Sequence, residues 1–250
     1  MAIYVHYDDS NLLQDVTRMV LQRDPFDHPF FSGTKKAKAT QPIHQWVEDV
    51  LRNPTDNAQA EGRAFTYGTL TSPVRITNLT QILERPFSVS RTAMKSQGAG
   101  VDNMFLYQKG KSLQELGLDI ELALLHGSIA SGTGSAARRL AGAVNFITTI
   151  ATAVASGTRL TESFFNDFVR LIWAQGGRPN EVYVGGQLKR GISTYTGGAT
   201  KQVDTTDRRL IASVSVYEND FTTMSVIPSR IINSTANSNA TCLILSMGSW

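Results

Sequence analysis

The sequence predicts an α+β fold in which helices and antiparallel strands occupy separate stretches of the chain. Two stretches, 102–127 and 161–175, carry apolar residues at three- and four-residue steps, as amphipathic helices do. Two others, 74–83 and 209–227, are rich in β-branched residues and alternate apolar with polar side chains, as strands do. Hydrophobic residues make up 41% of the 250, which is enough to bury a core.

The surface is expected to be lightly charged. Only 18% of the residues are charged, whereas Ser and Thr together number 46, so hydroxyls replace charges on much of the exterior. The net charge of +3 comes from basic residues spread along the chain and is weak evidence for nucleic-acid binding. This composition favours a protein whose surface mostly faces other protein.

The first 42 residues are predicted to form an arm rather than a domain. Ser10 can cap a helix whose apolar residues, over 10–23, lie on one side and need a partner surface. Prolines and glycine then break the segment 25–42, which we expect to be without regular structure and too apolar to be left in water. An extended arm lying on a neighbouring subunit satisfies both properties. The segment also holds Phe30, Phe31, Lys35, Lys36 and Lys38, the last three being the densest cation cluster of the chain.

A two-stranded ribbon is predicted next. Residues 43–51 favour a strand, a polar loop follows over 53–62, and the stretches 65–68 and 74–83 are again extended. Because an isolated two-stranded ribbon is marginally stable in water, we expect it to lie across another subunit.

The strongest predicted helix is 102–127, with Gly127 at its C-terminal cap. Its length of roughly 38 Å suits a spine around which other elements pack. A turn rich in Gly and Ser follows over 127–135, and the many alanines of 136–155 favour closely packed helix.

The rest of the chain adds one more helix and several strands. Thr161 is the expected N-cap of a helix that ends at Gly176 and whose aromatic face is core. The following elements are then predicted in order: a strand at 181–185, a short helix at 186–195, a hairpin of 209–217 with 221–227, and a strand at 241–246.

Catalytic and cofactor motifs give little support to an enzyme. The run 132–137, Gly-Thr-Gly-Ser-Ala-Ala, matches a relaxed dinucleotide fingerprint, but a long helix precedes it where that motif needs a strand. Arg138 and Arg139 after it could meet phosphate; two arginines opening a helix are more typical of solvent or interface contacts. The four histidines have no metal-type spacing, and no catalytic serine or carboxylate frame is present. We predict no enzyme activity, no cofactor and no metal, and we interpret the lone Cys242 as a small buried hydrophobe.

Targeting signals are not predicted either. The N-terminal residues lack a basic region and a sustained apolar core, and no stretch reaches 18 apolar residues. The expected setting is a reducing cytoplasm without membrane insertion.

A series of short motifs in order resembles the major capsid proteins of a group of tailed double-stranded DNA phages. The motifs that carry the resemblance are Trp46-Val-Glu-Asp49, Asn57-Ala58 with Glu61-Gly62, Asn78-Leu-Thr-Gln-Ile82, Val89-Ser-Arg-Thr-Ala93, Gly100, Gln108, Lys111-Ser-Leu-Gln-Glu-Leu116, Asp119-Ile-Glu-Leu-Ala-Leu-Leu125, Ser131-Gly132 and Ala136-Ala-Arg-Arg139. Each motif alone is weak, and the specificity comes from their order over roughly 40–200.

The resemblance implies the fold named after phage Hong Kong ninety-seven, with an arm, an extended loop, a spine helix, and peripheral and axial domains. The expected division is an N-terminal arm at 1–42, the extended loop at 43–88, a peripheral domain with the spine helix at 89–135, an axial domain at 136–205, and return strands of the peripheral domain at 206–250. Similar proteins generally continue past the position of Trp250 with another strand and a charged tail.

The function that the resemblance implies is self-assembly into pentamers and hexamers of an icosahedral shell that encloses phage double-stranded DNA. Portal, scaffold or decoration proteins and non-specific contact with the packaged DNA are the further partners, and the expected location is the virion capsid, assembled in the host bacterial cytoplasm. The candidate inter-subunit contacts are Phe30, Phe31, Lys35, Lys36, Lys38, Trp46, Arg75, Arg138 and Arg139. Two alternatives stay open: the shell of a bacterial nanocompartment with the same fold, and a nucleotide-dependent enzyme that uses the Gly132 turn.

Overall fold

The computed structural model describes residues 27–65, 67–95, 103–152, 160–195, 215–233 and 241–247. The chain divides into two compact units: unit 1 comprises Met1–His28 with Leu83–Ile120, and unit 2 comprises Pro29–Ile82 with Glu121–Trp250. The structure contains helices and sheets, which confirms the α+β class. The helix predicted at 10–23 lies outside the described residues.

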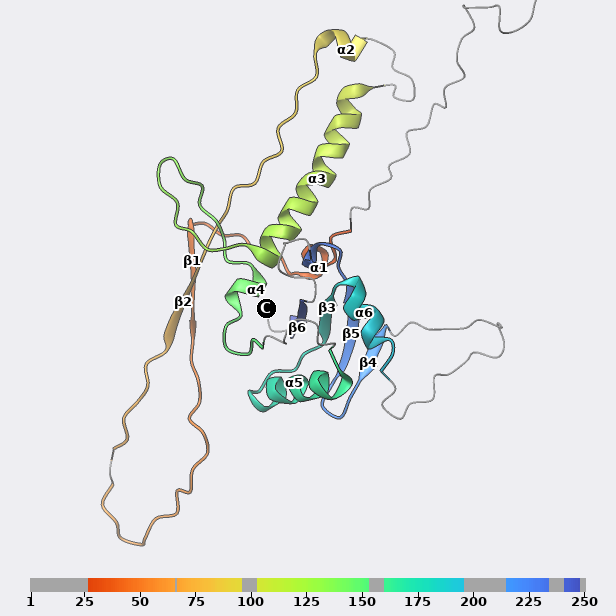
Figure 1. Cartoon of the computed structure of the whole chain (residues 1–250). Coiled ribbons are helices and arrows are strands. Elements are labelled where there is room, and N and C mark those ends of the chain that lie inside the picture. The colour runs from red at the N-terminus through yellow and green to blue at the C-terminus, as the bar shows by residue number, and fades with distance from the viewer. Residues whose placement is uncertain are drawn as a thin grey trace, which may run out of the picture. The chain divides into compact units, whose positions relative to one another are not determined.

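A four-stranded sheet is the centre of unit 2 (Figure 1). Its strands are β3 (Glu181–Val184), β4 (Val216–Glu218), β5 (Thr223–Pro228) and β6 (Cys242–Leu245), in the order β4-β5-β3-β6. The predicted hairpin is confirmed as the antiparallel pair β4 and β5, within the described part of its first strand. The expectation of antiparallel strands throughout is wrong, because β3 and β5 run parallel and the sheet is mixed. The alternating pattern within a strand identifies the strand but not its neighbour.

Apolar side chains cover both faces of this sheet. Val182 and Val184 point to one face, where they pack with Phe165 and Val169. Tyr183, between them, points to the opposite face, as the two-residue period of a strand requires. The cluster on that second face consists of Phe30, Leu125, Tyr183, Ile232, Leu243 and Leu245. The 3-10 helix η2 (Ile231–Asn233) and the C-terminal end of α3 (Met104–His126) supply part of this cluster.

Helices α5 (Glu162–Ala174) and α6 (Gly186–Ile192) cover the first face. The predicted cap is confirmed, since the Thr161 side chain accepts a hydrogen bond from the backbone N–H of Phe164, and the helix ends before Gly176, whose φ is +86°. The aromatic face of α5 is only partly core: Phe165 is buried, but Trp173 remains 54% exposed.

The ribbon consists of β1 (Ile43–Glu48) paired antiparallel with β2 (Val74–Leu79), so that Ile43 lies opposite Leu79 and Glu48 opposite Val74. Both strands are therefore confirmed, although shorter than predicted. The extended pairing expected at 65–68 is wrong for the described residues of that stretch, which belong to no strand. A long loop joins the two strands (Figure 1).

The stretch 127–152 contains one short helix, α4 (Ala143–Phe146), instead of the closely packed helix predicted from its alanines. Gly127 and Gly142 bring two backbone segments together here, with the Gly142 N–H donating to the carbonyl of Gly127. A Cβ on Gly127 would lie 2.5 Å from the Ala123 carbonyl oxygen. The small residues therefore serve close approach of loops rather than of helices.

Helix α3 is the predicted long helix, confirmed over its described residues. Its residues up to Ile120 belong to unit 1, which also contains α2 (Arg91–Lys95), and those from Glu121 onward belong to unit 2. The helix ends directly before Gly127, as expected, but Gly127 does not adopt the left-handed backbone conformation of the commonest caps.

The segment 25–42 was expected to lack regular structure, and this is wrong at α1 (Pro29–Gly33). Pro29 opens the helix, where its missing N–H costs nothing. The two N–H groups that follow it donate to a side chain that lies 91 and 90 positions further along the chain, which local sequence patterns cannot show.

Candidate assembly surfaces

The loop between β1 and β2, residues 49–73, exposes large apolar side chains almost completely. Their exposed fractions are 85% for Val50, 94% for Leu51, 95% for Phe65, 95% for Tyr67 and 93% for Leu70. Each such side chain in water forgoes the stabilisation that burial gives. The concentration of five such side chains in one loop makes the loop a candidate interaction surface.

The ribbon has two different faces. On one face, the Trp46 ring lies 5.5 Å from the Phe146 ring of α4, and its indole N–H donates to Glu48 at 2.8 Å. The opposite face carries Ile43 and Val47, which are 53% and 62% exposed. Arg75, directly across from Val47, is exposed on that same face. Trp46 therefore packs within unit 2, whereas Arg75 lies among exposed apolar residues.

The base of the ribbon is fastened to the loop that precedes α4. The Asn78 side chain donates to the Ala141 carbonyl oxygen at 3.2 Å and accepts from the Ala141 N–H at 2.9 Å. The Gln81 amide oxygen accepts from the N–H of Leu140. Arg138 also bonds to Thr80, so two motifs of the resemblance, 78–82 and 136–139, are in contact although about sixty residues separate them in sequence.

Arg138 completes this fastening. Its Nε donates to the Thr80 carbonyl oxygen at 2.6 Å, and a second guanidinium nitrogen lies 3.2 Å from the Thr80 hydroxyl. Arg138 is half-buried in this position, whereas Arg139 is exposed. The two arginines lie in a loop rather than at the start of a helix, so that part of the prediction is wrong. Arg139 remains available to a neighbour, and Arg138 serves mainly its own chain.

A buried carboxylate holds α1. The Glu121 side chain is completely buried and accepts hydrogen bonds from the backbone N–H of Phe30 at 3.0 Å and of Phe31 at 2.6 Å. These N–H groups belong to the first turn of α1, where the helix itself offers no acceptor. An anion is also favoured there by the positive end of the helix. From the sequence, Glu121 is interpreted as a solvated or ion-paired surface charge, and this is wrong, because the side chain is completely buried. An acid within the apolar run 120–125 is the signal that could have shown its role.

Phe30 belongs to the core of its own chain. The side chain is 7% exposed, and its ring meets Tyr183 edge-to-face at 5.2 Å. Burial, together with a hydrogen bond from the Tyr183 hydroxyl to Glu181, raises the pKa of Tyr183 well above its usual value. Gly33 permits this packing, because a Cβ there would lie 2.8 Å from the Tyr183 hydroxyl oxygen. Phe30 therefore offers almost no surface to a neighbour.

The remaining candidates of the arm are at the surface. Lys35, Lys36 and Lys38 are exposed, and Phe31 is half-buried. The Lys36 ammonium lies 4.4 Å from the centre of the Phe31 ring, within the range of a cation–π contact. These residues form a small cationic patch beside α1.

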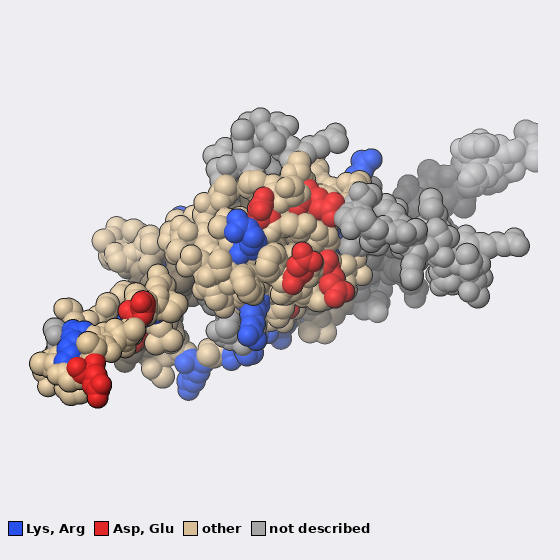
Figure 2. Space-filling view, turned by 90° about the horizontal axis from the view of Figure 1, so that it is seen from below, with Lys and Arg blue, Asp and Glu red and all other residues tan. Residues whose placement is uncertain are grey.

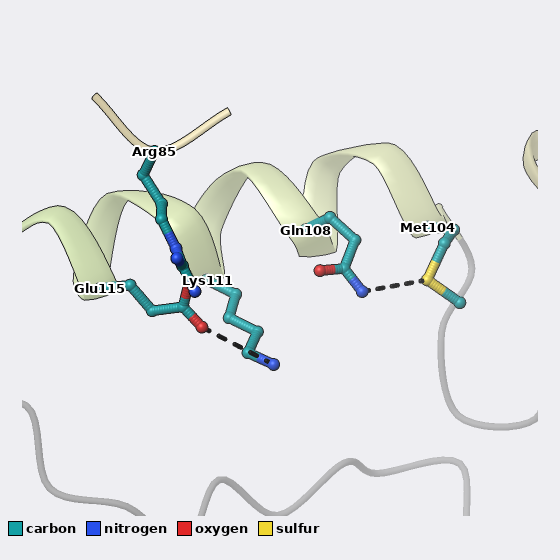
Figure 3. A network of polar contacts seen from close by, with 5 residues as sticks. All are labelled: Arg85, Met104, Gln108, Lys111 and Glu115. Carbon is teal, nitrogen blue, oxygen red and sulfur yellow. Dashed lines mark hydrogen bonds and ion pairs between the residues drawn. The ribbon is translucent and has the colours of Figure 1, made fainter. Parts of the chain in front are cut away.

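Within unit 1, an ion-pair network lies on the exposed side of α3 (Figure 3). The Arg85 Nε donates to Glu115 at 2.7 Å, and Lys111, one turn earlier on the helix, lies 3.8 Å from the same carboxylate. The hydrogen bond from Arg85 is the largest of the influences that lower the pKa of Glu115. Nearby, the rings of Phe87 and Phe105 are 5.3 Å apart. Aromatic and ionic contacts thus both join 83–87 to α3.

On the face drawn in Figure 2, basic and acidic residues are scattered among a majority of uncharged ones. This agrees with the 18% charged composition.

The glycine turn does not have the geometry of a phosphate-binding loop. Thr133 and Ala136 exchange backbone hydrogen bonds, and Ala130 pairs with Arg139, so the run forms a closed, hairpin-like loop. Gly132 is needed for its φ of +72°. The dinucleotide motif requires a helix N-terminus after a strand, and neither element is present at this turn.

Three further observations concern chemistry and location. Cys242 is half-buried in β6, and desolvation raises the pKa of its thiol to about 12, which is the behaviour of an inert hydrophobe. Among the described residues, no group of three or more His, Cys, Asp or Glu could hold a metal ion. None of the helices that the structure describes is long and apolar enough to cross a membrane.

Comparison with known proteins identifies the family. The model of the SU10 major capsid protein family matches residues 4–250. The major capsid protein of Escherichia phage Phieco32 is 32% identical over 127 residues, which are 50% of this chain and 36% of that relative. The match thus spans about a third of the relative's length, whereas the family model covers nearly the whole chain. This chain belongs to the SU10 major capsid protein family.

Proposed function

We propose that this chain is a phage major capsid protein that self-assembles into pentamers and hexamers of an icosahedral shell around double-stranded DNA. The observation that carries the proposal is the family match over residues 4–250. A relative that is 32% identical over half of this chain is itself named a phage major capsid protein. The expected location is the capsid of the virion, after assembly in the host cytoplasm.

The Hong Kong ninety-seven fold is part of the proposal. Two features support it: a ribbon that ends in a long loop, and a helix of 23 residues. In this interpretation β1 and β2 belong to the extended loop at 43–88, and α3 is the spine helix of a peripheral domain at 89–135. The arm at 1–42, the axial domain at 136–205 and the return strands at 206–250 complete the proposed division.

Assembly is proposed to work through apolar contacts that are weak singly and numerous in a shell. The loop 49–73 presents aromatic and aliphatic side chains that are almost fully exposed, while Asn78 and Arg138 hold the base of its ribbon. Many repeated contacts of this kind sum by multivalency into a stable closed particle.

The polar candidates have secondary roles in this proposal. Lys35, Lys36 and Lys38 are exposed and suit acidic residues of a neighbouring subunit, or non-specific contact with packaged DNA. Arg75 and Arg139 are exposed and suit the same kind of contact. Portal, scaffold or decoration proteins are the further proposed partners.

Electron microscopy of the purified protein, combined with ultraviolet absorbance spectra of its particles, tests the function. Icosahedral particles from infected cells that carry nucleic acid are the expected result. Particles that enclose protein cargo and no nucleic acid would instead support the alternative of a nanocompartment shell. A protein that remains a small oligomer at high concentration, in both recombinant and native preparations, contradicts the proposal.

The Gly132 turn gives no support to the enzyme alternative, because it is a closed loop and no described helix begins directly after it. Titration calorimetry with dinucleotides is its direct test, and we expect no saturable heat.

A further inference from the structure

Helix α3 carries an apolar row that the described residues leave uncovered. The row consists of Leu106, Gly110, Leu113 and Gly117, and we call it the open face of α3. Alternating spacings of four and three residues place these positions on one side of the helix. Leu106 and Leu113 are 60% and 61% exposed, more than the other large apolar side chains of α3. A Cβ on Gly110 would meet no atom within 4 Å.

The contacts described within unit 1 lie on the other side of this helix. Segment 83–87 reaches α3 through Arg85, which is hydrogen-bonded to Glu115 (Figure 3). Glu115 follows Leu106 by nine residues, or about two and a half turns, so the two side chains point in opposite directions. Segment 83–87 therefore leaves the open face free.

The described chain begins beside the open face. A Cβ on Gly117 would lie 4.0 Å from the Nδ1 atom of His28, the one atom within that distance. Residues 1–26 precede this point and lie outside the described part of the chain. The N-terminal stretch therefore joins the described structure at one end of the open face.

The helix predicted at 10–23 has an apolar row of matching period. Leu12, Val16 and Met19 follow one another at spacings of four and three residues. A helix of about 14 residues is marginal in water on its own, so it needs an apolar surface to pack on.

We propose that residues 10–23 form a helix that packs along the open face of α3 in the same chain. Such a helix is roughly 21 Å long, and the row from Leu106 to Gly117 extends over roughly 17 Å. The four residues 24–27 reach at most roughly 14 Å, which keeps the helix close to His28. Both helices then run toward His28 and are parallel. A partner surface in the same chain thus takes the place of the neighbouring subunit expected from the sequence.

The two glycines of the open face agree with a closely packed second helix. Glycine inside a helix is less favourable than alanine, and the described contacts give neither Gly110 nor Gly117 a reason to lack a side chain. A missing Cβ lets a second backbone approach closely. The short connection at 24–27 also raises the effective concentration of the helix at its own α3 above that at the α3 of a neighbour.

Limited trypsin digestion of the unassembled subunit tests whether the segment is docked. Arg18 lies in the proposed helix, and Arg63 is exposed in the loop 49–73. We expect cleavage after Arg18 to be at least about 10-fold slower than cleavage after Arg63. Equal rates at the two sites overturn the proposal.

A charged variant of the open face separates docking on α3 from docking elsewhere. Leu106→Asp with Leu113→Asp should speed cleavage after Arg18 at least about 10-fold, because carboxylates then lie where the helix packs. The matched control is Val50→Asp with Leu51→Asp, which also replaces two exposed aliphatic side chains and should leave this rate unchanged. An Arg18 rate that is the same in both variants contradicts the proposal.

Cross-linking tests the contact with milder changes. All chains carry Cys242→Ala, and one chain carries both Met19→Cys and Leu113→Cys and is treated with a flexible bis-maleimide. The control replaces Met19→Cys by Thr17→Cys, because Thr17 is on the opposite side of the proposed helix.

The expected product is a cross-link within one chain, at a yield at least several-fold above the Thr17 control, in free subunits and in particles alike. A covalent dimer as the main product would place the helix on a neighbouring subunit and overturn the proposal. A yield no higher than that of the control also overturns it. Because free subunits give the result, the proposal and the proposed function fail separately: particles that form without the cross-link leave the function standing.

Discussion

Replacing Glu121 by Gln tests the buried carboxylate that holds α1. The change keeps the shape of the side chain and removes its charge. Glu121 now accepts from two backbone N–H groups, at 3.0 Å and 2.6 Å. A hydrogen bond to a charged group contributes about 1.5–3 kcal/mol, whereas a neutral one contributes about 0.5–1.5 kcal/mol. The glutamine keeps one neutral bond and turns its NH₂ group toward the other N–H, which leaves a buried donor unsatisfied at a cost of about 1–3 kcal/mol.

The expected loss is therefore about 2–4 kcal/mol in the free energy of unfolding. Urea unfolding of the unassembled subunit, followed by circular dichroism, measures it. Asp119→Asn is the matched control, because it removes an exposed carboxylate two residues away on the same helix and should change stability by no more than about 0.5 kcal/mol. Hydrogen exchange adds a local measurement: the amides of Phe30 and Phe31 should lose protection in the Gln variant alone. Equal stability of both variants, with protection of both amides retained, would refute the argument.

Three further outcomes are expected. Gly132→Ala should destabilise the subunit by about 1–3 kcal/mol in thermal unfolding, because φ is +72° and the new Cβ would lie 2.9 Å from the backbone nitrogen of Arg138. Gly134→Ala, with open space around it, should leave the stability unchanged. Arg138→Lys should lower stability by about 1–2 kcal/mol and speed hydrogen exchange at the base of the ribbon, while Arg139→Lys changes neither; equal effects would contradict the assigned contact. Deleting residues 1–26 should leave a folded subunit that no longer closes shells, and normal megadalton particles in size-exclusion chromatography would show that the arm is dispensable.

The arm deletion has to stop before α1 for a structural reason. A deletion through residue 42 would also remove Phe30, which is 7% exposed and packs on Tyr183. Loss of such a core aromatic costs about 3–5 kcal/mol. The longer deletion would therefore test folding and assembly together, whereas the shorter one leaves the core intact.

Features that depend on near neighbours in the chain were predictable from the sequence. Thr161 caps α5 through a residue three positions later, and Gly176 ends the same helix through its own backbone conformation. The period of α3 and the alternation in β2 are equally local. In each case the residues that determine the element lie within one or two turns of it.

Features that depend on partners far away in the chain could not be predicted from the sequence. Helix α1 forms where the Glu121 carboxylate satisfies its first N–H groups, and Glu121 lies 91 positions from Phe30. The alanines of 136–155 suit a helix locally, but residues 138–141 instead bond to 78–81 on the ribbon. The parallel pairing of β3 with β5 likewise depends on a crossover that the pattern of either strand does not record.

The same distinction between near and distant partners divides the candidate contact residues into two groups. Composition and pattern identified aromatic and basic residues, but they could not tell which of them their own chain would use. Phe30 and Arg138 are engaged within unit 2, whereas Lys35, Arg75 and Arg139 remain exposed. The strongest exposed apolar surface, in the loop 49–73, was predicted only as part of a ribbon. A residue is a good candidate for assembly when its own fold leaves it unused, and for this chain that criterion favours Phe65 and Tyr67 over Phe30.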